Sequence, residues 1–109
     1  MKKRINNFSR KMTKNLNLPY SHFMLYETGM DDSYFLKAQI GIVSNWYDGN
    51  PCNMHLDQLG KKIKSSIINK KNLIGFQFTT IGISDGITME TYGKIYYSLY
   101  SRELIEDRV

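Results

Sequence analysis

The spacing of apolar residues predicts two β-strands in the middle of the chain. Residues 38–44, AQIGIVS, are almost continuously apolar and β-branched, which is typical of a strand covered on both faces, as in parallel sheets. Residues 73–80, LIGFQFTT, alternate instead, and this period of two places Ile74, Phe76 and Phe78 on one side of a second strand. The two segments are expected to be neighbours in one sheet.

An amphipathic helix is predicted between these strands. Asn50 suits the N-cap position and Pro51 suits the first turn, where its missing N–H costs nothing. Apolar residues then recur at spacings of three, four and four, so one stripe of the helix is expected to face a core. The stripe consists of Leu56, Leu59, Ile63 and Ile67. The residues expected to face water are Lys61, Lys62 and Lys64.

The order strand, helix, strand indicates a right-handed crossover between parallel strands. A short helix is predicted over 21–28 and ends at Gly29, which suits a left-handed cap. Ser101 is expected to cap a last helix. The predicted fold class is α/β, a partial three-layer domain with a parallel βαβ core.

Composition narrows the class of protein. A chain of 109 residues makes one small domain at most, and 41% hydrophobic with 23% charged residues is ordinary for a globular protein. No apolar run approaches the ~20 residues that a membrane span needs. The single cysteine excludes an internal disulfide framework. We therefore expect a soluble protein in a reducing compartment.

The net charge of +5 is concentrated before the first acidic residue, Glu27. The basic residues of this segment are Lys2, Lys3, Arg4, Arg10, Lys11 and Lys14. Such a segment could contact phosphates, act as an organelle presequence, or be a solvated arm. No basic helical face with interleaved aromatic residues accompanies the charges, which favours the solvated arm over a nucleic-acid site.

The single thiol and one carboxylate follow the two strands. Cys52 comes after the first strand, and if the helix begins at Asn50 its first turn favours a thiolate, the form that binds metal. The alternative is a small buried hydrophobe. Asp85 comes after the second strand and is either a Mg²⁺ ligand or part of an ordinary Asp-Gly turn. Both residues are expected at the carboxyl edge of the sheet, where parallel sheets bind ligands.

Other ligands within the chain are few. His55 follows Cys52 by three residues and His22 lies far away in the sequence, and a hydrogen-bonding structural role is expected for His55. One thiolate cannot by itself hold an iron–sulfur cluster. Partners for Cys52 must therefore come from elsewhere.

Several motifs together resemble one protein family. NPCNMHL, FTTIGISDGITM and YSLYSRELIED occur in this order, and together they resemble the amino-terminal region of the dihydroxy-acid dehydratases, enzymes of branched-chain (valine and isoleucine) amino-acid biosynthesis. SRKMT, LYETGM and QIGIVSNWYDGN are similar to further segments of the family. The resemblance covers nearly the whole chain, so residues 1–109 are expected to be the amino-terminal part of the iron–sulfur and magnesium domain, a single and incomplete domain.

The resemblance implies a reaction and two cofactors. Members of the family remove water from a 2,3-dihydroxy carboxylate and produce a 2-oxo acid, with a 2Fe-2S cluster and Mg²⁺. It implies that Cys52 is a ligand of the cluster and that Asp85 is a ligand of Mg²⁺. The remaining ligands and the catalytic base lie in parts of the family's longer chain that have no counterpart here, so we expect an isolated chain of this length to be inactive.

The sequence departs from the family pattern at two informative positions. Glu90 stands where the family has glycine, and it adds a negative charge near Asp85. Tyr100 stands where the family has proline at the entry to the last helix. A phosphogluconate-type, sugar-acid dehydratase is the alternative within the family, and a small basic nucleic-acid-binding protein is the alternative outside it.

The resemblance also implies partners and a compartment. The expected substrate is the dihydroxy carboxylate, with no nucleic acid and no membrane as a partner, and the family forms homodimers. The expected location is the cytoplasm, or the mitochondrial matrix or plastid in a eukaryote.

Overall fold

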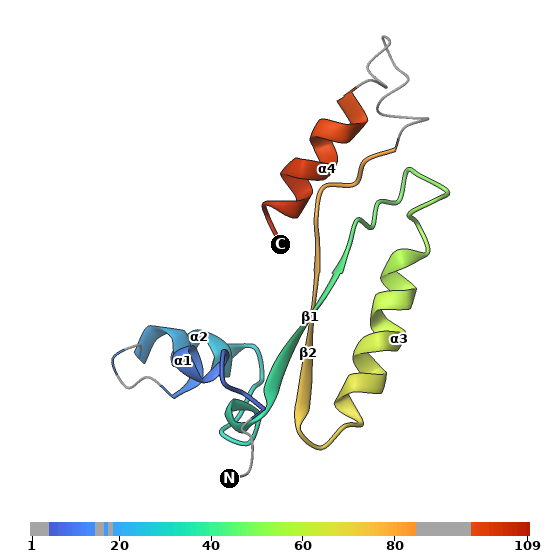
Figure 1. Cartoon of the computed structure of the whole chain (residues 1–109). Helices are drawn as coiled ribbons and strands as arrows, with labels where there is room; N and C mark the ends of the chain where they lie inside the picture. Colours follow the sequence, from blue (N-terminus) through green and yellow to red (C-terminus); the bar gives the residue numbers. More distant parts are fainter. Residues whose placement is uncertain (1–4, 15–16, 18, 85–96) are drawn as a thin grey trace. The chain divides into compact units, whose positions relative to one another are not determined.

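The computed structural model describes residues 5–14, 17, 19–84 and 97–109. The order of elements is α1, α2, a 3₁₀ turn η1, β1, α3, β2 and α4 (Figure 1). Contacts divide the chain into two compact units: unit 1 is Met1–Gly41 with Lys64–Phe76, and unit 2 is Ile42–Ile63 with Gln77–Val109. Among the described residues, no helix has the length and apolar character needed to cross a membrane.

The two predicted strands form one parallel sheet. β1 spans Ala38–Ser44 and β2 spans Leu73–Thr79, so the first prediction is confirmed to the residue and the second to within one. The N–H of Ala38 donates to Asn72 O in unit 1, and the N–H of Thr80 donates to Ser44 O in unit 2, each at 2.9 Å. The residue numbers of the bonded partners increase in the same direction along both strands, which is the mark of a parallel pair. The predicted α/β class with a parallel βαβ core is confirmed.

The covering of β1 differs from the prediction. Ile42 is buried at 7% exposure, but Ile40 and Val43 remain 37% and 38% exposed. A strand that is buried on both faces needs a packed layer on each side. The apolar run therefore predicted the strand correctly, while full cover of both its faces was wrong for the described part of the chain.

The crossover helix α3 spans Leu56–Ile68 and begins six residues later than Asn50, so the predicted start was wrong. Its orientation also differs from the prediction. Gly60 is buried, whereas Leu59 and Ile63 of the predicted stripe are 44% and 51% exposed. Lys64, which was expected to face water, is half-buried.

The approach of α3 to β2 explains this rotation. A Cβ on Gly60 would lie only 2.5 Å from Nε2 of Gln77, so the absence of a side chain lets the helix come close at this point. Gln77 Nε2 donates to both the carbonyl and the Oδ1 of Asp57, each at 3.3 Å. Residues three or four positions from Gly60 share its face. That face carries the half-buried residues of the helix, which are Leu56, Asp57, Lys64 and Ile67.

The amino-terminal helices of unit 1 pack around Phe35. α1 spans Arg10–Thr13, α2 spans Pro19–Glu27 and η1 spans Tyr34–Leu36. Phe35 is 4% exposed, and its carbonyl accepts a hydrogen bond of 3.2 Å from Thr13 Oγ1, itself only 2% exposed. This buried bond joins α1 to η1.

The end of α2 confirms the prediction for Gly29, although the helix begins at Pro19 rather than Ser21. Gly29 has a φ of +84°, and its N–H donates to Tyr26 O at 2.8 Å. The N–H of Met30 reaches back to Leu25 O at 3.4 Å. These two bonds define a Schellman motif, and the packing of Leu25 near the buried Met30 completes it.

A pH effect follows from the turn that leads into η1. The side chain of Ser33 hydrogen-bonds Asp31, and together with the Ser33 N–H at 2.8 Å it lowers the pKa of this carboxyl group. The stabilisation from a lowered pKa is complete above the unfolded-state pKa and is lost as pH falls through the folded-state pKa. Ser33→Ala is therefore expected to raise the pKa of Asp31, measured by NMR titration of the carboxyl carbon. An unchanged pKa would contradict the assignment.

The last helix, α4, spans Ser98–Glu106, with Tyr97 at the N-cap position. The prediction that Ser101 caps this helix was wrong. Ser101 lies inside it, and its Oγ donates to Tyr97 O at 3.4 Å. Tyr100 lies in the first turn and is 64% exposed, and its ring centroid is 6.2 Å from that of Tyr97.

Candidate functional site

The loop between β1 and α3 is built on buried asparagine side chains. Asn50 and Asn53 are 4% and 5% exposed. Asn50 Nδ2 donates to Asn53 Oδ1 at 2.9 Å, and Asn53 Nδ2 donates to Asn45 O at 2.7 Å. Burying a carboxamide is unfavourable unless its polar atoms are paired, and here the paired atoms hold the loop to its own beginning.

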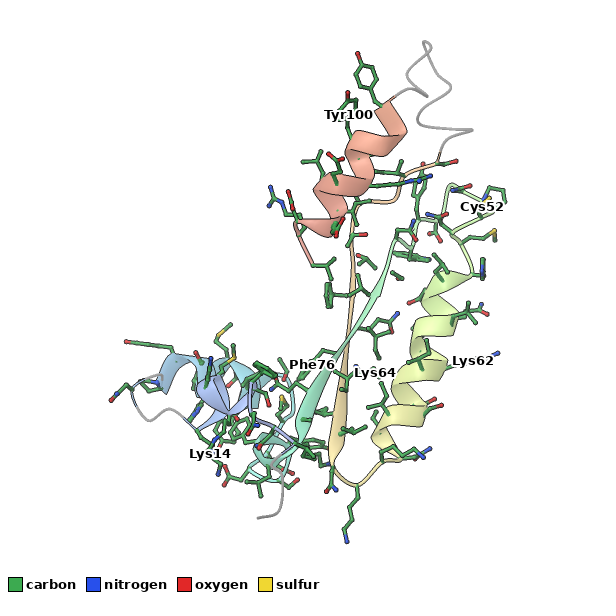
Figure 2. All side chains as sticks on the ribbon, viewed as in Figure 1. Lys14, Cys52, Lys62, Lys64, Phe76 and Tyr100 are labelled. Carbon is green, nitrogen blue, oxygen red and sulfur yellow. The ribbon has the colours of Figure 1, made fainter. Side chains whose placement is uncertain are left out.

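Cys52 lies on the outside of this loop, ahead of α3 rather than in its first turn (Figure 2). Its N–H donates to Asn50 Oδ1 at 3.2 Å. The N–H groups of Asn53 and Met54 donate to Asn50 O, each at 2.9 Å, and close a single helical turn around the cysteine. The thiol is exposed, so the alternative of a small buried hydrophobe was wrong. An anchored backbone thus carries an accessible sulfur.

The chain that follows β2 leaves the sheet beside this loop. The bond from the Thr80 N–H to Ser44 O joins the residue that follows β2 to the last residue of β1. Further on, a Cβ on Gly82 would lie 2.4 Å from the Cβ of Tyr47 and 3.5 Å from Trp46 O. The loop of residues 45–55 and the segment 80–84 therefore leave the sheet at the same end, where Tyr47 and Gly82 approach each other, and we call this end the carboxyl edge. Asp85 follows directly but lies outside the described residues, as does Glu90.

Gly82→Ala tests this contact. The new Cβ has no room beside Tyr47, and overpacking of this kind costs about 1–3 kcal/mol in the free energy of unfolding. Urea denaturation of the chain measures the loss. When the same substitution is made in a Tyr47→Gly background, where the obstructing Cβ is absent, it is expected to cost much less. A single variant as stable as the parent would show that the two segments do not touch.

The hydroxyl group of Ser44 also lies at this edge, and it lacks a partner in the described part of the chain. The Oγ of Ser44, the last residue of β1, is buried and has no hydrogen bond there. Buried hydroxyl groups in native proteins are almost always paired. The carboxyl edge thus offers a hydrogen-bonding position to a group outside the described residues.

The two histidines belong to different units of the chain. His55 is exposed immediately before α3, whereas in unit 1 the Nε2 of His22 lies 3.0 Å from Met12 O and its ring stacks on Phe35 with centroids 5.4 Å apart. His22 is thus part of the packing of the amino-terminal helices. Within the described ranges, no three His, Cys, Asp or Glu side chains are grouped as metal ligands.

Sequence reasoning missed the residues that support the site. The asparagines of NPCN were visible as letters, but burial of Asn53 and its bond to Asn45 depend on how the loop folds back. The contact between Gly82 and Tyr47 joins residues far apart in sequence. A glycine after an alternating strand does signal close approach, which is the one sequence feature that pointed to it.

The chain is similar to known dehydratases along its full length. A family model described as Dihydroxy-acid/6-phosphogluconate dehydratase N-terminal matches residues 37–109. The dihydroxy-acid dehydratase of Francisella tularensis subsp. novicida is 52% identical over all 109 residues, which are 19% of that protein. The mitochondrial dihydroxy-acid dehydratase of Schizosaccharomyces pombe is 48% identical over the same length, 18% of that protein.

A third relative, the dihydroxy-acid dehydratase of Lactococcus lactis subsp. lactis, is 50% identical over 105 residues, which are 96% of this chain and 18% of that protein. The chain thus spans about one fifth of the length of the curated relatives it matches. The match of the family model covers β1, α3, β2 and α4. It also covers residues 45–55, the loop that carries Cys52, which we call the cysteine loop. The chain therefore belongs to the dihydroxy-acid/6-phosphogluconate dehydratase N-terminal family.

Proposed function

We propose that the chain is the amino-terminal part of a dihydroxy-acid dehydratase, which removes water from a 2,3-dihydroxy carboxylate and yields a 2-oxo acid in branched-chain amino-acid biosynthesis. The observation that carries the proposal is identity of about 50% along the whole chain to relatives that bear this name. The accessible sulfur of Cys52 at the carboxyl edge supports it, because parallel sheets bind their ligands there.

The residues of the carboxyl edge fit the cofactors of such an enzyme. Cys52 would be one ligand of a 2Fe-2S cluster, since its sulfur is exposed and its backbone is fixed by buried hydrogen bonds. Asp85 would be one ligand of Mg²⁺, which prefers oxygen donors. The other ligands would come from the rest of the dehydratase, of which this chain corresponds to about a fifth.

The cluster and Mg²⁺ would act as Lewis acids when bound. They would assist the loss of hydroxide and neutralise the charge of the substrate carboxylate. The task of this chain is then to hold two kinds of donor apart and in place. The Asn50–Asn53 pair fixes the sulfur side, and the contact between Gly82 and Tyr47 fixes the start of the segment that leads to Asp85. In the proposed enzyme, a soft donor and a hard donor would be supplied by the two segments that follow β1 and β2.

The finer assignments are part of the same proposal. Relatives named as dihydroxy-acid dehydratases favour that substrate over a sugar acid, which is the alternative within the family. The working enzyme would be a homodimer. Its location would be the cytoplasm, or the matrix of an organelle in a eukaryote, as the name of the Schizosaccharomyces pombe relative says of that protein.

A chimera tests the proposal. The 109 residues of this chain replace the matching segment of the Francisella tularensis subsp. novicida dehydratase, which aligns with all of them. The purified chimera is expected to carry a 2Fe-2S cluster and to convert 2,3-dihydroxyisovalerate to the 2-oxo acid.

The isolated chain is the companion experiment. Because it supplies one thiolate, we expect neither a stoichiometric cluster nor dehydratase activity after anaerobic reconstitution with iron and sulfide. A folded chimera that gains no cluster under the same conditions would contradict the proposed function.

A further inference from the structure

Asn53 connects three parts of the cysteine loop. Its side-chain Nδ2 donates to Asn45 O at 2.7 Å, just after β1, and its Oδ1 accepts from Asn50 Nδ2 at 2.9 Å. Its backbone carbonyl accepts from the N–H of Leu56, the first residue of α3, at 3.0 Å. At 5% exposure the carboxamide has little access to water, so these bonds are the ones available to it in the described structure.

The connection reaches Cys52 through Asn50. The Asn50 side chain uses its Nδ2 on Asn53 and its Oδ1 on the N–H of Cys52. Turning the Asn50 amide would therefore break both bonds together. Buried hydrogen bonds that share a group in this way reinforce each other. The backbone of Cys52 is thus held indirectly by Asn53, while the sulfur itself remains exposed.

We propose that Asn53 is a positioning residue for Cys52, acting through Asn50 to present the sulfur to the iron–sulfur cluster in one fixed orientation. This inference rests on the proposed function for its ligand and on the buried hydrogen bonds for its mechanism. Outer-shell partners that orient a metal ligand commonly change metal affinity about 10- to 100-fold when they are removed. Because its side chain is buried, Asn53 would not itself be a ligand, and its effect is expected in how firmly a cluster is held.

Two variants and a control test the proposal. Asn53→Ala removes both side-chain bonds, whereas Asn53→Asp keeps an oxygen for Asn50 Nδ2 but turns the donor to Asn45 O into a buried, negatively charged acceptor. Asn69→Ala, at an exposed position just after α3, is the matched control. In the chimera, the rate of cluster loss to a chelator is followed by visible absorbance. We expect loss about 10- to 100-fold faster for Asn53→Ala, faster loss for Asn53→Asp as well because its carboxylate faces Asn45 O, and no change for Asn69→Ala.

Amide hydrogen exchange separates positioning from a general loss of structure. In the full 109-residue chain, the N–H groups of Cys52 and Met54 are expected to lose protection in both Asn53 variants, while those within α3 and β2 keep theirs. Equal loss throughout α3 would mean that Asn53 is merely structural and would overturn the proposal. If Asn53→Ala does not fold, Asn53→Asp decides in the same way.

The outcomes also separate this inference from the proposed function. If the parent chimera holds no cluster, the proposed function fails, and the exchange of the Cys52 N–H alone decides whether Asn53 fixes the loop. If the parent chimera holds a cluster and both Asn53 variants release it at the parental rate, Asn53 has no positioning role, although the proposed function stands.

Discussion

Cys52→Ser is expected to abolish the cluster and the dehydratase activity of the chimera. This chain contains no other cysteine, so no neighbouring thiol of its own can take over as a ligand. A serine oxygen is a harder and more weakly acidic donor, which suits an iron–sulfur cluster poorly. Because even outer-shell changes cost up to ~100-fold in affinity or activity, we expect loss of a ligand itself to exceed that. Cluster content from visible absorbance and kcat are measured on the same preparation.

A change elsewhere on the same loop serves as the control. Met54 lies two residues away and its side chain is 56% exposed, so Met54→Leu keeps the loop and its apolar surface. We expect this variant to retain both the cluster and kcat. Full cluster content in Cys52→Ser would show that the sulfur of this chain is not a ligand.

Phe35→Ala is expected to destabilise unit 1 by about 3–5 kcal/mol, the usual cost of truncating a buried phenylalanine. Phe35 is 4% exposed, its ring stacks on His22, and the Tyr26 ring meets it edge-on with centroids 5.1 Å apart. Removing the ring leaves a cavity among α1, α2 and η1. Since small domains have only about 5–15 kcal/mol of stability in total, this loss is a large fraction of it. Urea unfolding followed by circular dichroism measures the change.

The matched control truncates a phenylalanine that is almost fully exposed. Phe8 is 87% exposed, and Phe8→Ala is expected to change the free energy of unfolding by less than about 0.5 kcal/mol. If the two variants lose the same stability, Phe35 is not the centre of the packing that the amino-terminal helices share.

The parts of the fold that depend on local sequence were predictable. The apolar run of β1 and the alternation of β2 gave the strands and their order, because strand periodicity is a property of neighbouring residues. Gly29 gave the end of α2, because a left-handed cap needs a residue without a Cβ. The motif around Cys52 predicted the family, which the matches along the whole chain confirm.

The parts that depend on tertiary packing were not predictable in the same way. Apolar spacing placed Leu59 and Ile63 on the buried face of α3, but Gly60 and its contact with Gln77 decide which face meets β2. Glycine carries no signal in a hydrophobic pattern, although it allows the closest approach. The start of α3 was set too early because Asn50 caps the separate turn around Cys52 instead of the helix itself.

The parallel pairing of β1 and β2 constrains the order of events during synthesis. Residues 38 and 72, and likewise 44 and 80, meet only after the whole of α3 has been made. On the ribosome, β1 with its partly exposed Ile40 and Val43 therefore stays unpaired until α3 and β2 have been made, and at about 5–20 residues per second this synthesis takes far longer than closing the loop itself. Because Cys52 lies between the two strands in sequence, its loop is also complete before β2 is made, whereas the contact of that loop with Gly82 forms only afterwards.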